Sequence, residues 1–138
     1  MRSPLSDSDA QLIDAASDLL VRAHDADAHR VAAAARGASG EVYLGLSLRS
    51  PRVSVCAESS ALANARIGGE ETIEVMVSVG LRADGTAVVV NPCGVCREVV
   101  PAIAPGIRTL ADEGGGRVVS VEAGDLLPMP WVRARTYE

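Results

Sequence analysis

The stretch TIEVMVSVGLRADGTAVVVNPCGVC, residues 72–96, decides the fold of this chain. Two valine-rich runs within it, Thr72–Val79 and Thr86–Val90, are separated by a polar, glycine-containing turn and predict two β-strands. Pro92 ends the second strand because proline has no backbone N–H to give to a sheet. The residues from Gly94 to about Ile103 then predict a helix that begins at a cysteine pair.

Similar patterns predict the remaining elements. Apolar residues recur every three or four positions in two further segments, which is typical of amphipathic helices, and short apolar runs between glycine-rich turns are typical of strands. The helices are expected at Ser6–Ala23 and Cys56–Ile67, and the strands at Val31–Arg36, Val42–Leu48, Ile107–Leu110 and Val118–Val121. This order predicts an α/β fold, a central mixed sheet flanked by helices.

Length and composition limit the number of domains and the classes of function that this chain can have. A chain of 138 residues is long enough for one hydrophobic core, so we expect a single domain over residues 1–138. All 13 basic residues are arginine, which excludes chemistry that needs a lysine, and the net charge of -5 argues against binding to nucleic acid. The N-terminus has no apolar leader and no apolar run is long enough to span a bilayer, so we expect a cytoplasmic protein.

The three cysteines are the candidate site. Cys56 and the pair Cys93 and Cys96 begin two predicted helices, where the helix dipole favours thiolate. Catalytic zinc takes three protein ligands and keeps a fourth position open, so three thiolates suit a catalytic Zn²⁺. Glu58 follows closely enough to move protons beside the metal.

Simpler interpretations of the same residues remain open. The zinc site is structural if a histidine, His24 or His29, supplies a fourth ligand. Glu58 is then only a negative charge at the start of a helix. The two histidines flank a polar stretch and are otherwise solvent-exposed loop residues with no assigned role.

With Cys56-Ala57-Glu58 and Pro92-Cys93-Gly94-Val95-Cys96, the chain resembles the cytidine deaminase family, above all small cytidine deaminases and blasticidin S deaminases. The resemblance covers nearly the whole chain. The resemblance implies a three-layer fold whose central mixed sheet has five strands. It also implies a homotetramer, or a homodimer, whose active sites are shared between subunits.

The resemblance further implies a mechanism. Cys56, Cys93 and Cys96 hold Zn²⁺, which lowers the pKa of a bound water so that hydroxide adds to the carbon bearing the exocyclic amine. Glu58 delivers the proton that allows ammonia to leave. The backbone at Ala57 and Cys93 lines the base.

The chain also departs from the family pattern. The strand after Gly45 lacks the Asn and Glu that hold ribose in cytidine deaminases and has Ser47 and Arg49 instead. Loss of hydrogen-bonding partners favours a free or modified base, or an aminonucleoside such as blasticidin S, over plain cytidine. Arg49 suits an acceptor or an anionic group. Ser59 replaces an arginine that donates to the zinc-bound sulfurs in many relatives, and we expect Arg97 to take over that role.

Three further residues are candidates for substrate contact. Asn91 either shapes the turn before Pro92 or meets the base. Trp131 and Tyr137 are aromatic residues near the C-terminus that we expect to close the pocket, although packing against the sheet edge explains Trp131 equally well. Phe is absent, which leaves few rings for this purpose.

The sequence as a whole therefore predicts a zinc-dependent hydrolytic deaminase acting on a nucleobase-like heterocycle. Its substrate is a cytosine-type nucleoside, a free or modified base, or a blasticidin S-like compound. The alternative is a non-catalytic zinc-stabilised protein that binds a nucleobase or nucleoside. A nucleic-acid editing enzyme is disfavoured by the acidic charge and the scarcity of aromatic residues.

Overall fold

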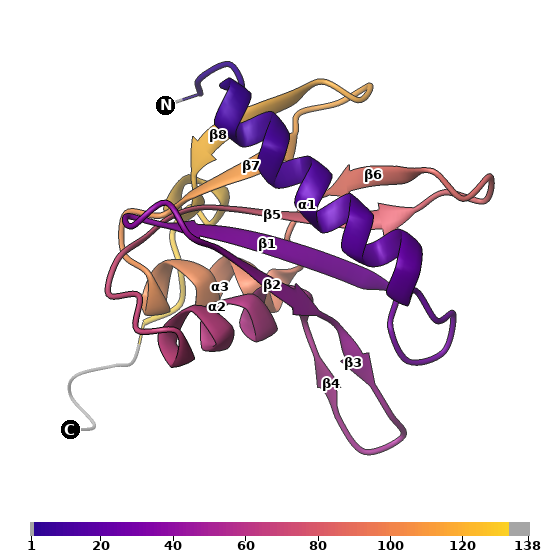
Figure 1. The fold of residues 1–138 in the computed structure, drawn as a ribbon. Coiled ribbons are helices and arrows are strands. Elements are labelled where there is room, and N and C mark those ends of the chain that lie inside the picture. The colour runs from indigo at the N-terminus through magenta and orange to yellow at the C-terminus, as the bar shows by residue number, and fades with distance from the viewer. Residues whose placement is uncertain (1, 133–138) are drawn as a thin grey trace.

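The computed structural model describes residues 2–132 and has three layers, with a β-sheet between helix α1 on one side and helices α2 and α3 on the other (Figure 1). The helices are α1 (Asp7–Ala23), α2 (Ala57–Ile67), α3 (Gly94–Ile103) and the short 3-10 helix η1 (Ala123–Leu126). The strands are β1 (Val31–Gly37), β2 (Val42–Leu46), β3 (Leu48–Arg49), β4 (Ser54–Val55), β5 (Ile73–Leu81), β6 (Ala87–Val90), β7 (Arg108–Asp112) and β8 (Val118–Glu122). The predicted α/β class is confirmed.

Strand β5 organises the main sheet, whose order is β2-β1-β5-β7-β8 with β6 also paired to β5. Its nine residues are long enough to pair with two strands along one edge. The C-terminal part, Ser78–Leu81, pairs with β6, and Val75 and Met76 pair with β7. The described sheet therefore has six strands rather than the expected five. Only the β5–β7 pairing is parallel among the named strands, which makes the sheet mixed as predicted.

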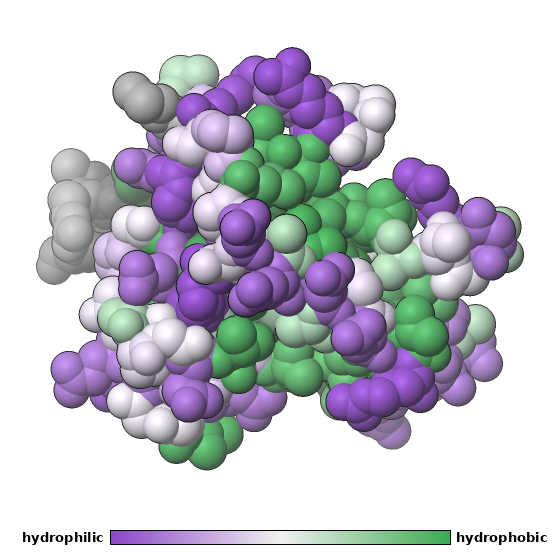
Figure 2. Space-filling model, turned by 45° about the horizontal axis from the view of Figure 1, so that its top comes forward, coloured by the Kyte–Doolittle hydropathy of each residue, from purple (hydrophilic) through white to green (hydrophobic). Residues whose placement is uncertain are grey.

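Helix α1 covers one face of the sheet. Ser6 caps it through a reciprocal capping box with Asp9, and its buried residues Leu12, Ala16 and Leu20 pack against β1 and β5. One helix covers only part of a wide sheet, and Figure 2 shows hydrophobic side chains still visible at the surface in this region. No helix within residues 2–132 is long and apolar enough to cross a membrane.

Helices α2 and α3 cover the opposite face and lie side by side (Figure 1). Helix α2 approaches β2 so closely that a Cβ on Gly45 would lie 2.3 Å from the carbonyl oxygen of Ala57 and 2.3 Å from the amide nitrogen of Ala61. Both neighbours are backbone atoms that cannot rotate away, so this position requires glycine. The contact sets where α2 begins relative to the sheet.

One region differs from the predicted elements. The expected strand Val42–Leu48 ends at Leu46, and the chain then forms a separate two-stranded hairpin, β3 and β4, that projects from the sheet (Figure 1). The interruption is at Ser47, whose hydroxyl accepts hydrogen bonds from the backbone N–H groups of Arg30 (3.1 Å) and Val31 (3.0 Å). The Ser47 hydroxyl thus takes the place of a backbone acceptor at this point, while the Ser47 N–H still donates to the carbonyl of Val31.

Candidate active site

The three cysteines come together at the N-termini of α2 and α3. Cys56 is the N-cap of α2, Cys93 is the N-cap of α3, and Cys96 lies in the first turn of α3. Their sulfur atoms all lie within 4.8 Å of one another, and the Cys56 and Cys93 sulfurs are 3.6 Å apart. Neither cap uses its side chain in a capping hydrogen bond, which leaves the sulfurs available for a metal.

This donor set fits a thiophilic metal. It contains three cysteines and, within the described residues, no histidine, so neither His24 nor His29 joins it. Instead, the Nδ1 of His29 lies 2.8 Å from the carbonyl oxygen of Ser47. Three soft ligands with no fourth side chain match a site that keeps one coordination position open.

The three thiols differ in their surroundings. Burial, together with hydrogen bonding to Cys93, raises the pKa of the Cys56 thiol. Burial and the negative charge of Glu58 strongly raise the pKa of Cys96. Burial also opposes ionisation of Cys93, but the backbone N–H groups of Cys96 and Val95 and the neighbouring thiols outweigh it, so the pKa of Cys93 is lowered. Cys93 is therefore the sulfur that the helix N-terminus best prepares as thiolate.

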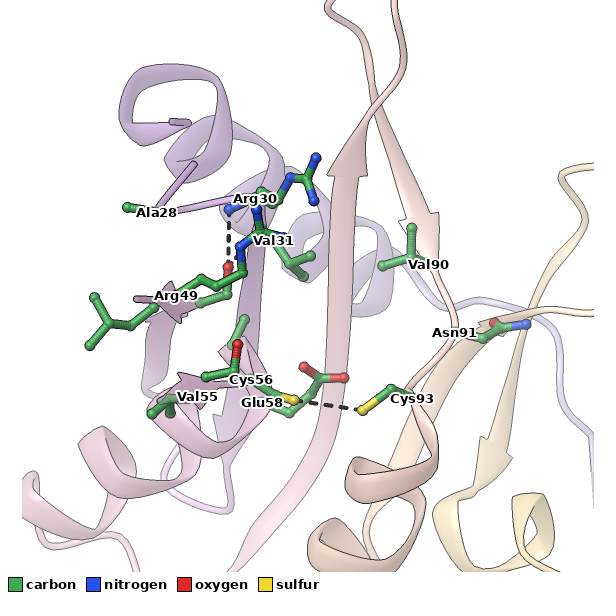
Figure 3. Close-up of a pocket in the computed structure, with 14 residues that line it drawn as sticks. Ala28, Arg30, Val31, Arg49, Val55, Cys56, Glu58, Val90, Asn91 and Cys93 are labelled. Carbon is green, nitrogen blue, oxygen red and sulfur yellow. Dashed lines mark hydrogen bonds between the residues drawn. The ribbon is translucent and has the colours of Figure 1, made fainter. Parts of the chain in front are cut away.

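Glu58 lies in the first turn of α2 and is only 5% exposed. Its side chain forms no hydrogen bond or ion pair with the residues described in this structure. It lines the same pocket as Cys56 and Cys93, and Figure 3 shows these three side chains grouped at one end of that pocket. A buried carboxylate without a protein partner, next to a cysteine cluster, is placed to exchange protons with a bound ligand.

The pocket measures about 230 Å³ and has mainly apolar walls. Valines from three elements contribute to the walls near the sulfurs: Val31, Val55 and Val90 (Figure 3). The backbone turn at Ala57, itself fully buried, adds to the same surface. A flat heterocycle fits between such side chains better than a charged group does.

The other predicted site residues are placed in different ways. Ser47, Arg49 and Asn91 line the pocket, but the Ser47 hydroxyl is engaged by Arg30 and Val31. The Asn91 side chain donates to the carbonyl of Asp112 (2.9 Å) and accepts from its N–H (2.8 Å), which ties the end of β6 to β7. Asn91 thus holds the turn before Cys93, one of the two roles expected of it.

Trp131 lies elsewhere. Trp131 is 76% exposed and lines a separate groove formed by α3 and the segment after η1, together with residues such as Glu98 and Leu127. It does not line the cysteine pocket, and Tyr137 lies outside the described residues. No aromatic residue lines the cysteine pocket within residues 2–132.

Arg97 holds the backbone beside the cysteines. Its Nε donates to the carbonyl of Pro92 (3.0 Å) and its Nη1 to the carbonyl of Leu126 (3.2 Å). The guanidinium therefore fixes the residue immediately before Cys93. Arg97 therefore positions the backbone before Cys93 and does not donate to the sulfurs directly.

Sequence reasoning missed Arg30, which also lines the pocket. Its segment lies beside the one that contains Arg49, because the N–H of Arg49 donates to the carbonyl of Ala28 (3.0 Å) and the N–H of Ser47 donates to that of Val31 (2.9 Å). Extending the register of the predicted β1–β2 hairpin by a few residues would have brought these two segments together.

Comparisons with known proteins agree with this geometry. No family model matches the chain. Blasticidin-S deaminase of Bacillus cereus is 30% identical over 135 residues, which cover 94% of this chain and 96% of that protein. The crystal structure of cytidine deaminase from Burkholderia pseudomallei has a TM-score of 0.72 and 26% identity, covering 92% of this chain and 100% of that one.

The cytidine deaminase from Bacillus anthracis, at 20% identity, shares the fold with a TM-score of 0.74 and covers 88% of each chain. The sequence match to blasticidin-S deaminase spans both helix starts that carry the cysteines and Glu58. The fold, the cysteine cluster and this near full-length relative together show that the chain belongs to the cytidine deaminase family, as its cysteine motifs predict.

Proposed function

We propose that this protein is a zinc-dependent hydrolytic deaminase that removes the exocyclic amine of a nucleobase-like heterocycle. The observation that carries the proposal is the buried carboxylate of Glu58 in the same pocket as Cys56 and Cys93, with Cys96 completing the sulfur cluster. Hydrolytic deamination needs a site for an activated water and a group that moves protons. This pocket provides residues for both.

Cys56, Cys93 and Cys96 would hold Zn²⁺ by their thiolates. When bound, zinc supplies a water activated for attack on the ring carbon that bears the amine. Three thiolate charges on a divalent ion reduce its acidity unless nearby donors offset them. The N-termini of α2 and α3 offer such donors, because both face the cluster with their N–H groups and positive dipole ends.

Glu58 is the catalytic residue of the proposal. Its carboxylate transfers the two protons of the attacking water in turn, one to the adjacent ring nitrogen and one to the departing amine, so that the water oxygen becomes the ring carbonyl and the amine leaves as ammonia. Burial near apolar walls keeps bulk water away from this exchange.

The substrate is proposed from the pocket and from the relatives. Its volume of about 230 Å³ is below the usual range of pockets for drug-sized ligands, roughly 300–1,000 Å³, and suits a single-ring heterocycle. The relatives are named for cytidine and blasticidin S. A cytosine-type nucleoside, a free or modified base, and a blasticidin S-like aminonucleoside all present an amine on such a ring.

The subunit arrangement and location are also proposals. We propose a homotetramer, or a homodimer, with shared active sites, in which Trp131 and Tyr137 cover a pocket, and a cytoplasmic single-domain protein. The pocket walls described above contain no aromatic residue, which supports a contribution from elsewhere. Sedimentation velocity will measure the assembly, and a purely monomeric enzyme with full activity would contradict shared sites.

Ammonia release from zinc-loaded protein tests the activity. The panel comprises cytosine, cytidine, deoxycytidine, blasticidin S, and representative aminopurines and aminotriazines. We expect turnover of at least one aminopyrimidine, and loss of that turnover in Glu58→Gln with zinc content unchanged. Binding of these compounds without turnover by the wild-type protein would instead support the non-catalytic alternative.

A further inference from the structure

We propose that the part of the pocket lined by Arg30 and Arg49 binds an anionic group, a phosphate or a carboxylate, carried on the substituent of the heterocycle. The preferred substrate is then an anionic aminonucleoside rather than a neutral nucleoside. The inference rests on the proposed function, because the cysteines and Glu58 define where the amine-bearing ring lies.

Both arginines line the pocket that contains Glu58, Cys56 and Cys93. Figure 3 shows Arg30 toward one end of the pocket, Glu58 and Cys93 toward the other, and Arg49 to one side between them. A molecule that places its amine beside Glu58 and extends along the pocket therefore brings its substituent to the arginines.

The two guanidinium groups have no protein partner within residues 2–132. Five of the nine other arginines within residues 2–132 are paired: Arg2 and Arg117 with Glu113, Arg36 with Asp9, and Arg97 and Arg108 with backbone or hydroxyl oxygens. Among the residues that the structure describes, Glu58 is the only acidic one that lines the pocket. Asp27 lies with Arg49 on a neighbouring groove and forms no ion pair with it.

The backbone that carries these arginines is well fixed. Ser47 accepts the N–H groups of Arg30 and Val31, and Arg49 donates its N–H to Ala28. The two cations therefore belong to adjoining backbone segments that hydrogen bonds hold together. Side chains carried on such fixed backbone segments lose less conformational entropy on binding than side chains on mobile segments.

An anion is the complementary ligand. Arginine presents planar, permanently charged N–H donors that match phosphate and carboxylate oxygens. The protein as a whole carries a charge of -5 and repels anions at long range, so a local pair of unpaired cations at the pocket counteracts that repulsion.

Kinetics and binding of the zinc-loaded enzyme test the subsite with three ligands: neutral cytidine, cytidine 5′-monophosphate and the 5′-carboxylate of cytidine. We expect kcat/KM and calorimetric affinity to favour at least one anion over cytidine by about tenfold at low salt, with the preference falling as salt rises. Arg49→Gln and Arg30→Gln should each lower kcat/KM and affinity for the anions severalfold more than they lower the values for cytidine.

Arg52→Gln is the matched control, because Arg52 is an exposed arginine of the same hairpin that lines no described pocket wall beside the cysteines. A stronger response to phosphate than to carboxylate, or the reverse, identifies the anion and supports the subsite in either case. Equal kcat/KM and affinity for cytidine and both anions, or a preference untouched by the arginine variants, overturns it while turnover of cytidine upholds the deaminase. Arginine-dependent anion binding without turnover of any compound supports the subsite and rejects the enzyme.

Discussion

The two ends of the pocket are built by different physical means. At the cysteine end, two helices begin against the same sheet face, and their first residues supply the sulfurs and Glu58. At the arginine end, loop and hairpin segments are held together by a few hydrogen bonds, such as that from the N–H of Arg49 to the carbonyl of Ala28. The first end is positioned by buried packing and the second by polar contacts near the surface.

This difference assigns the chemical reaction to the cysteine end of the pocket and the choice of substrate to the arginine end. Buried packing tolerates little displacement, which suits atoms that must hold a metal and move protons. Exposed side chains on a hairpin are easily exchanged without disturbing the core, which suits recognition of the variable part of a substrate. Damage at the cysteine end should abolish turnover, and damage at the arginine end should change which substrate is preferred.

The largest effects are expected at the cysteine end, where substitution of Cys96 and substitution of Glu58 should have different consequences. Cys96→Ser removes a buried ligand, so zinc content and deaminase activity should both be lost. Glu58→Gln keeps the ligands, so zinc should stay while kcat falls by about 10³, within the range for loss of a general acid–base. Metal analysis and ammonia assays on both variants check this. Retention of stoichiometric zinc by Cys96→Ser would remove that cysteine from the site.

The next largest effect is expected where α2 packs against Gly45 of β2, between the two ends of the pocket. Gly45→Ala places a Cβ 2.3 Å from backbone atoms of α2, so we expect a loss of about 3 kcal/mol of unfolding free energy and weaker zinc retention. Gly124→Ala is the control, because a Cβ there meets nothing within 4 Å. Urea unfolding of both variants measures the difference. Equal stability of the two would show that α2 shifts at no cost.

The sequence allowed more to be predicted at the cysteine end than at the arginine end. Residue spacing predicts the helix beginning at Gly94 to the residue, and the motif around Cys56 predicts which side chains meet, because local helix signals and a few ligand types determine both. The hairpin at Leu48 and the place of Arg30 depend on the hydrogen bonds that the Ser47 hydroxyl accepts. No local sequence pattern predicts such a side-chain contact.

A smaller effect is expected at Arg97, which joins Pro92, the residue before Cys93, to Leu126, the last residue of η1. Arg97→Ala removes two charge-assisted hydrogen bonds to backbone carbonyls, each worth about 1.5 kcal/mol or more when formed. We expect faster zinc loss to a chelator and reduced turnover, with the fold retained by circular dichroism. Arg97→Lys should recover part of the loss. Wild-type zinc content and turnover in Arg97→Ala would contradict a positioning role.

The smallest effect is expected for a change confined to the arginine end. Ser47→Ala leaves the N–H groups of Arg30 and Val31 without the hydroxyl, at a cost of about 1 kcal/mol because water can replace part of the lost contact. Zinc content should stay at the wild-type level, since this hydroxyl bonds to backbone N–H groups and not to a cysteine. Selectivity between charged and neutral substrates should weaken, because the Arg30 backbone is no longer held in place. Loss of zinc in Ser47→Ala, measured beside Gly45→Ala, would show instead that the two ends are mechanically coupled through β2.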